Sequence, residues 1–252
     1  MKKSSISKSE YELIEKIKNA QLAVFEIDDA VKLTGWKKEK SYQVVHNLKN
    51  KSLISEINGG KYAISLFMEG INLFEIASNI VWPSYISFWS ALNYYKFTEQ
   101  LPRTVFVAAT KSKRDIEFEN NKIKFVTIAK KRFFGYRKVD EIIIAQREKA
   151  LLDSLLLPRY AGGIDEVFKC LKNAWDEIDK ELLVEYAMKM ENKSLLKRLG
   201  HLIESGNLEI NRELIEKMRS KTGKGYSKLD PEMERKGEYN NKWRLVINVK
   251  LI

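Results

Sequence analysis

The sequence has 252 residues, of which 44% are hydrophobic and 31% charged, with a net charge of +11 and a pI near 9.4. This length allows one large domain or two smaller ones, each able to bury a core. No stretch reaches the roughly 18 apolar residues of a membrane span, and the polar start lacks the apolar run of a signal peptide. We therefore expect a cytoplasmic protein with no membrane partner. The single cysteine, Cys170, excludes an internal disulfide and is expected to be a small buried hydrophobe.

The net positive charge favours a polyanionic partner. Nucleic acid is the first candidate and an anionic membrane surface the second. A solvated, lysine-rich surface without a polyanionic partner would give the same total, so the distribution of the charge carries more information.

Residues 1–70 contain the elements of a winged helix-turn-helix in the expected order. Apolar spacing predicts three helices and two short strands, over residues 8–19, 27–33, 37–50, 53–57 and 61–66. Ser7 or Ser9 can cap the first helix, and the turn Asn58-Gly59-Gly60 favours a tight hairpin between the strands. We predict a DNA-binding domain here.

The third helix is the predicted recognition element. A helical wheel points Ser41, Val45, Leu48 and Ser52 inward. Asn and Gln pair with adenine in the major groove, and Lys meets phosphate or guanine. The predicted DNA-binding residues are Lys37, Lys38, Lys40, Gln43, His46 and Asn47 on this helix, with Lys61 beside the hairpin turn. The alternative is an ordinary polar face of a surface helix.

Residues 71–252 are expected to form a larger mixed α/β domain, so the fold class is α+β. An amphipathic helix over 67–80 connects the two domains, and an aromatic-rich helix follows over 84–95. Two or three helices are predicted within 164–218. The remaining predictions are strands over 104–109, 116–118, 123–128, 139–144 and 243–252, and a helix over 147–157 that Pro158 ends.

Basic residues concentrate in residues 111–138, which hold ten lysines and arginines against three acids, a local surplus of +7. Phe125, Phe133, Phe134 and Tyr136 interleave with them, a mixture that can bind nucleic acid by phosphate contact and stacking. An acidic protein partner, or a hairpin with its aromatics in the core, fits equally. The predicted second basic patch comprises Lys111, Lys113, Arg114, Lys130, Lys131 and Arg132.

Ordered motifs over about residues 80–250 resemble the AbiEi antitoxin family. The first is Tyr85 to Leu92 followed by Thr98-Glu99-Gln100-Leu101-Pro102, similar to the family's YxSxxSAL…TEQxP. Phe133 to Tyr136 resembles its FFGY element, and Ala145 to Asp153 its A-x-x-EK-x-LLD helix, with Arg147 where many members have proline. Leu157 to Gly163 resembles LPxYxGG, and Leu229-Asp230-Pro231 with Trp243 to Asn248 resembles the LDP…WxLxxN ending.

The resemblance implies the antitoxin of a type IV toxin–antitoxin pair. Such a protein represses its own promoter, a double-stranded DNA partner, and counteracts a nucleotidyltransferase toxin of the AbiEii type. It leaves open whether antitoxin and toxin bind directly, and whether the chain binds DNA as a monomer or a homodimer. Glu148 and Asp153 are expected to be structural, and Ser87 and Ser90 to cap or pack.

Enzyme signatures are scarce, so we predict no catalytic, metal or cofactor site. The only histidines are His46 and His201, no hydrolase elbow or phosphate loop occurs, and Cys and His are too few for zinc. A magnesium-dependent nuclease using Asp115 and Glu117 is one alternative. A winged-helix transcription factor with a ligand-sensing second domain is another.

Overall fold

The N-terminal unit, residues 8–65, combines three helices with a small sheet. We describe a computed structural model, which covers residues 6–65, 72–100 and 103–251. The unit's elements are α1 (Lys8–Asn19), β1 (Phe25–Glu26), α2 (Ile27–Thr34), α3 (Lys38–Asn50), β2 (Ile54–Asn58) and β3 (Lys61–Ile64). Ser7 caps α1 and forms a capping box with Glu10. The strands form an antiparallel sheet in the order β1-β3-β2. The two-residue strand β1 was not predicted.

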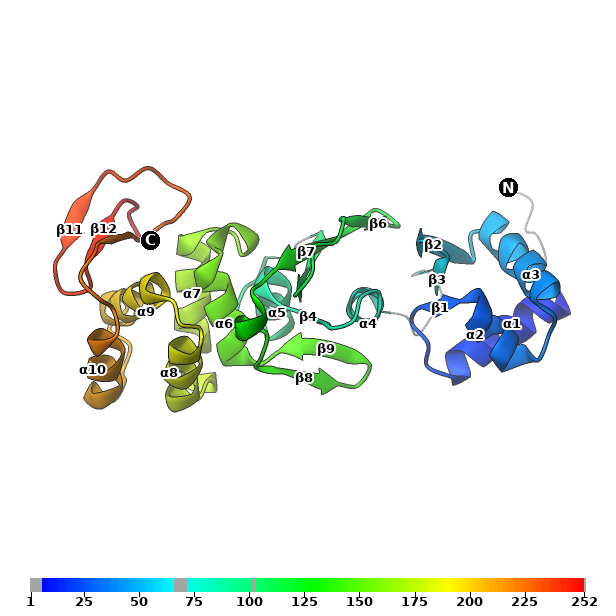
Figure 1. Cartoon of the computed structure of the whole chain (residues 1–252), viewed down its shortest axis with the longest axis horizontal. Helices are drawn as coiled ribbons and strands as arrows, with labels where there is room; N and C mark the ends of the chain where they lie inside the picture. The colour runs from blue at the N-terminus through cyan, green and yellow to red at the C-terminus, as the bar shows by residue number, and fades with distance from the viewer. Residues whose placement is uncertain (1–5, 66–71, 101–102, 252) are drawn as a thin grey trace.

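A six-stranded mixed sheet forms the part of the larger unit that lies next to the N-terminal unit (Figure 1). Its order is β6-β7-β5-β4-β9-β8, in which β5 and β7 are parallel, as are β4 and β9. Helices α5 and α6 pack together, and α4 contacts β4, β5 and β9. These elements are α4 (Leu73–Asn79), β4 (Ser84–Ile86), α5 (Phe88–Tyr94), β5 (Thr104–Ala109), β6 (Ile116–Phe118), β7 (Asn121–Thr127), β8 (Tyr136–Val139), β9 (Ile142–Ala145) and α6 (Arg147–Leu156).

Four helices and a small sheet complete the chain at the end far from the N-terminal unit (Figure 1). These elements are α7 (Ile164–Ala174), α8 (Lys180–Lys189), α9 (Lys193–Ser205), α10 (Arg212–Ser220), β10 (Ser227–Lys228), β11 (Glu238–Asn240) and β12 (Leu245–Ile247). Trp243 is fully buried, and its ring lies directly over Gly200 of α9. This contact fastens the small sheet to the helices. A mixed α+β fold, as expected from the sequence, is therefore observed.

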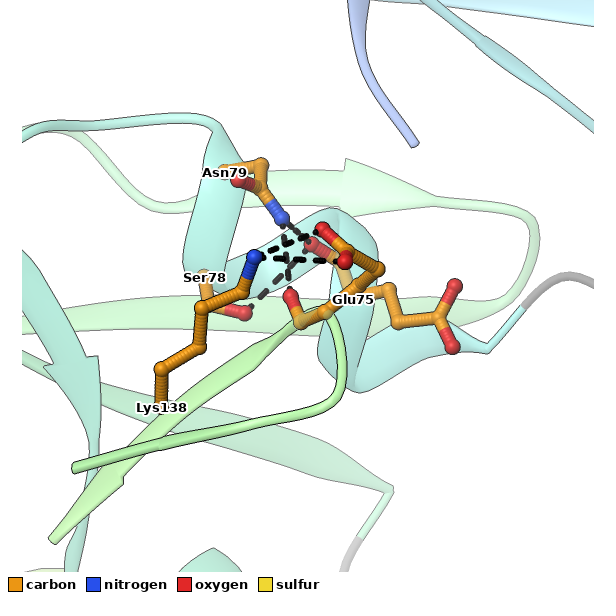
Figure 2. Close-up of polar contacts among 5 residues, drawn as sticks. Glu75, Ser78, Asn79 and Lys138 are labelled. Carbon is orange, nitrogen blue, oxygen red and sulfur yellow. Dashed lines mark hydrogen bonds and ion pairs between the residues drawn. The ribbon is translucent and has the colours of Figure 1, made fainter. Parts of the chain in front are cut away.

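Helix α4 is tied to the β8–β9 hairpin by polar contacts (Figure 2). The Asn79 amide donates to the carbonyl of Glu75 at 2.8 Å and to that of Glu141 at 3.2 Å. Glu141 also pairs with Lys138 across the hairpin turn. Burial, followed by repulsion from Glu141, raises the pKa of Glu75. The start of the predicted connecting helix, residues 67–71, lies outside the described residues.

Several boundary predictions were wrong. Residues 84–86 form strand β4 rather than the first turn of a helix, because they pair with both β5 and β9. The predicted strand over 139–144 is a hairpin, because Asp140 takes a left-handed φ of 50° and turns the chain between β8 and β9. Residues 164–218, all of which are described, hold four α-helices rather than two or three. The final strand is confined to Leu245–Ile247.

Candidate nucleic-acid interface

Helix α3 buries one side in the core of the N-terminal unit. Val45 and Leu48, as predicted, are buried with Leu13 and Ile17 of α1. Val44 joins them, whereas Ser52 is exposed, because the helix ends at Asn50 and Ser52 takes a left-handed φ of 56°. The apolar side fixes the rotation of the helix about its axis, and this determines which side chains face solvent.

The opposite side of α3 presents a polar row. Gln43, His46 and Asn47 are exposed, and within the described residues their side chains form no hydrogen bond with another part of the protein. The Lys40 ammonium lies 4.1 Å from the centroid of the Trp36 ring and is also exposed. The packing of the larger unit therefore leaves this row open, as an element that reads a duplex groove requires.

The start of α3 carries two exposed lysines in different electrostatic settings. Lys37 occupies the N-cap position, and its side chain makes no capping hydrogen bond. Lys38 pairs with Asp28 of α2 at 2.9 Å, and the hydrogen bond to Asp28 raises the pKa of Lys38. Because Asp28 already neutralises Lys38, Lys37 and Lys40 are the better placed of the three to meet phosphate.

Lys61, predicted to contact phosphate beside the hairpin turn, makes contacts within the protein, although its side chain is 36% exposed. Its ammonium donates to the carbonyl of Ile80 at 3.1 Å and lies 3.8 Å from the Glu26 carboxylate. One face of the β2–β3 hairpin meets the larger unit: Ser55 donates to Glu119 at 3.3 Å, and Ile57 joins the larger core. The hairpin thus serves as a contact between the two units, and Lys61 with it.

The second basic patch consists of two loops at one end of the sheet. Lys111, Lys113 and Arg114 follow β5, and residues 130–132 follow β7; because β5 and β7 are adjacent and parallel, both loops lie beyond their carboxyl ends. Five of the six residues are exposed, whereas Arg132 is half-buried and donates to the carbonyl of Met190. Lys131 pairs with Glu191 at 2.6 Å.

The aromatic residues of this segment are engaged within the protein. Phe133 and Tyr136 both pack against the buried ring of Tyr85, with centroids 5.0 Å apart in each case. Phe134 packs on Tyr186, and Phe125 is buried. Of these four rings only that of Tyr136 is exposed, at 37%, so stacking has little free ring surface and phosphate contact is the main chemistry open to the patch.

A buried polar network was not predicted from the sequence. The Lys149 ammonium donates to Tyr85 at 2.9 Å and to the Asp153 carboxylate; Tyr85 and Ser87 donate to the same carboxylate at 3.0 and 2.8 Å. Lys149 and Asp153 are 0% exposed, and burial lowers the pKa of Lys149 although Asp153 opposes the shift. The i, i+4 spacing of a lysine and an aspartate on an apolar helix is the signal that could have revealed it.

The motif residues expected to be structural each form hydrogen bonds within the protein. Ser87 donates to Asp153, and the Ser90 hydroxyl accepts the backbone N–H of Phe106. Glu148 accepts the backbone N–H of Asp179 ahead of α8. Cys170 is fully buried, and burial raises the pKa of its thiol to about 12.

The residues considered for a nuclease site are not gathered around a cation site. Asp115 pairs with Lys122 at 2.9 Å, and Glu117 is exposed on β6. Across the described ranges, no three His, Cys, Asp or Glu residues are grouped so as to hold a metal ion. In the same ranges, no helix is both long and apolar enough to cross a bilayer.

Comparison with known proteins adds information on the fold. No family model matches the sequence, and no curated protein matches it. Among solved structures, the chain is similar to the crystal structure of the RV2827C protein from Mycobacterium tuberculosis, with a TM-score of 0.66 and 12% sequence identity. The match covers 96% of this chain and 92% of the other. At this identity the likeness establishes a shared fold and nothing about activity.

Proposed function

We propose that the chain is a DNA-binding repressor and the antitoxin of a type IV toxin–antitoxin pair. In this proposal, residues 8–65 are a winged helix-turn-helix and α3 enters the major groove. The observation that carries the DNA-binding part is the exposed row of Gln43, His46 and Asn47, whose polar groups are free of protein contacts within the described residues. Such groups on the second helix of the motif match the donors and acceptors of base edges.

The antitoxin part rests on the sequence motifs that resemble the AbiEi family. The buried positions of Tyr85, Ser87, Lys149 and Asp153 give those motifs a common physical purpose, since they hold β4 and α6 together. In this proposal the larger unit counteracts a nucleotidyltransferase toxin and the N-terminal unit represses the shared promoter.

The DNA-binding part is tested by removing the base-reading side chains. A Gln43→Ala/Asn47→Ala double variant should lose about 1–3 kcal/mol of binding for each bidentate pair it abolishes, measured by gel shift on the chain's own promoter. Asn19→Ala/Gln100→Ala removes the same side-chain types from exposed positions elsewhere and should bind like the wild type. Equal affinity of the two double variants for the promoter would contradict the assignment.

The antitoxin part needs its own experiment. Co-expression with the product of an adjacent nucleotidyltransferase gene should restore growth that the toxin alone arrests. The Gln43→Ala/Asn47→Ala variant should still rescue when both genes are driven from an unrelated promoter, because the antitoxin activity is assigned to the larger unit. Failure of the wild-type chain to rescue would remove the antitoxin proposal and leave the DNA-binding one standing.

A further inference from the structure

A pocket of about 380 Å³ lies beyond the carboxyl end of β7, where the end of α6 meets α9. Ligands of open α/β sheets bind at such strand ends. The polar residues that line the pocket include Arg132, Arg198, Asn192 and Ser194. The apolar residues include Leu157 and Pro231. No carboxylate lines it among the described residues. The pocket therefore pairs a cationic end with an apolar wall.

Arg198 is the buried cation of this pocket. It is only 6% exposed, and its Nε donates to the carbonyl of Lys228 at 3.1 Å. Its two terminal nitrogens form no hydrogen bond with any residue that the structure describes. Burial lowers the pKa of Arg198 to about 10, although Asp230 and Glu232 oppose the shift from outside the pocket. The terminal nitrogens of this guanidinium can therefore donate to an anion in the pocket.

Two further groups converge on the same space. Arg132, from the loop after β7, uses its Nε to bind the carbonyl of Met190, which leaves its terminal nitrogens available at the pocket. The amino terminus of α9 also lies here: the Asn192 side chain caps Leu195, so the backbone N–H groups of Lys193 and Ser194 have no acceptor within the helix. The first turn of α9 contains no acidic residue that would compete for them.

We propose that this pocket binds a phosphomonoester of nucleotide size, with the phosphate held by Arg132, Arg198 and the amino terminus of α9. Arginine forks match phosphate oxygens bidentately, and helix amino termini favour the same dianion. The apolar wall and the volume provide room for an organic group attached to the phosphate. The inference is independent of the proposed DNA reading, because α3 contributes no residue to the pocket.

The phosphomonoester could belong to one of two ligands, a free mononucleotide or the terminal phosphate of a nucleic acid. Calorimetric titration of the full chain with AMP, GMP, CMP and UMP, each beside its nucleoside, tests the first. A short oligothymidylate with a 5′-phosphate, beside its 5′-hydroxyl form, tests the second. We expect binding that requires the phosphate in at least one pair; the pair that shows it identifies the source.

Substitutions inside and outside the pocket test whether the phosphomonoester binds there. Arg132→Gln should weaken phosphomonoester binding about ten-fold or more, because it removes charged hydrogen bonds to the phosphate. Arg198→Lys should weaken binding by a similar factor, because lysine keeps the positive charge but lacks the paired N–H donors of the guanidinium. Arg147→Gln is the matched control: Arg147 is also half-buried and also donates to a carbonyl, that of Glu177, but lies outside the pocket.

Three results would overturn the inference: no phosphate-dependent binding at millimolar ligand, equal binding of nucleosides, or undiminished binding by Arg132→Gln. If Arg198→Lys fails to fold, judged by its circular dichroism, Arg132→Gln alone carries the test. Promoter binding by the same preparations, measured in parallel, separates failure of this site from failure of the DNA-binding proposal.

Discussion

Replacing Lys149 by methionine should be among the most destabilising single changes in the larger unit. The variant keeps the volume of the side chain but removes the only cation that hydrogen-bonds to Asp153 among the described residues. Asp153 is fully buried and would retain two neutral donors, Tyr85 and Ser87. Breaking a buried pair by removing one partner costs about 3–5 kcal/mol, and whole domains are stable by about 5–15 kcal/mol.

Removing the charges of both Lys149 and Asp153 should lower the free energy of unfolding less than removing that of Lys149 alone. In Lys149→Met/Asp153→Leu no buried charge is left without a counter-ion, and well-packed apolar replacements of buried pairs are often close to neutral. The double variant should therefore be more stable than Lys149→Met alone, with a coupling free energy of about 1–3 kcal/mol. Tyr85 and Ser87 then lose their shared acceptor, so full recovery is not expected.

Equilibrium unfolding in urea, followed by tryptophan fluorescence, measures these differences, because Trp82, Trp89, Trp175 and Trp243 all lie in the larger unit. Lys189→Met is the matched control: Lys189 also lies over the Phe134 ring, at 4.4 Å, but is exposed. It should shift the unfolding free energy by less than about 0.5 kcal/mol. A loss below about 1 kcal/mol for Lys149→Met, or additivity in the double variant, would refute the reasoning.

Other parts of the molecule allow equally direct predictions. A Cβ at residue 200 would clash with the ring of Trp243, so Gly200→Ala should lower the melting temperature by overpacking worth about 1–3 kcal/mol. A Cβ at residue 225 would have no neighbour within 4 Å, so Gly225→Ala should leave the melting temperature unchanged. The raised pKa of Glu75 means that its ionised form is disfavoured in the folded state, so its contribution to stability is present at acid pH and lost as the pH rises through the folded pKa. Glu75→Gln should therefore raise the melting temperature at neutral pH and give no gain at acid pH; a gain that did not depend on pH would contradict this cause. Cys170, whose thiol pKa is about 12, should react with Ellman's reagent only after the chain unfolds, and rapid reaction of the native protein would show that the site opens.

Capping residues and apolar spacing predicted the helices whose first and last residues are fixed by nearby sequence. Helix α1 has the predicted bounds, because Ser7 and Glu10 cap it and its apolar residues repeat at helical spacing. Residues 84–86 could not be assigned in this way. They are buried at every position, and a short buried strand does not alternate, so only pairing with β5 and β9 distinguishes it from a helical turn.

The candidate site also has features that local sequence predicts and features that depend on contacts between distant segments. The exposed row of α3 follows from helical periodicity and is found as predicted, because one apolar side determines the other. The direction of Lys61 depends on where the next unit places the carbonyl of Ile80, which no pattern within the hairpin contains. The pocket beside α9 joins residues more than sixty positions apart, Arg132 and Arg198, and had no signal in either segment alone.

The charge needed to attract DNA lies largely outside the unit proposed to read it. Residues 8–65 hold ten lysines and arginines against eight acids, whereas residues 111–138 alone have a surplus of +7. We therefore expect the basic loops of the larger unit to bind phosphates as well. Changing Lys111, Lys113 and Arg114 to glutamine should reduce the slope of the logarithm of promoter affinity against the logarithm of salt concentration by about 0.9 for each phosphate that these side chains neutralise. Preference for the promoter over unrelated DNA should persist, because α3 is unchanged; an unaltered slope would mean that these loops do not meet the duplex.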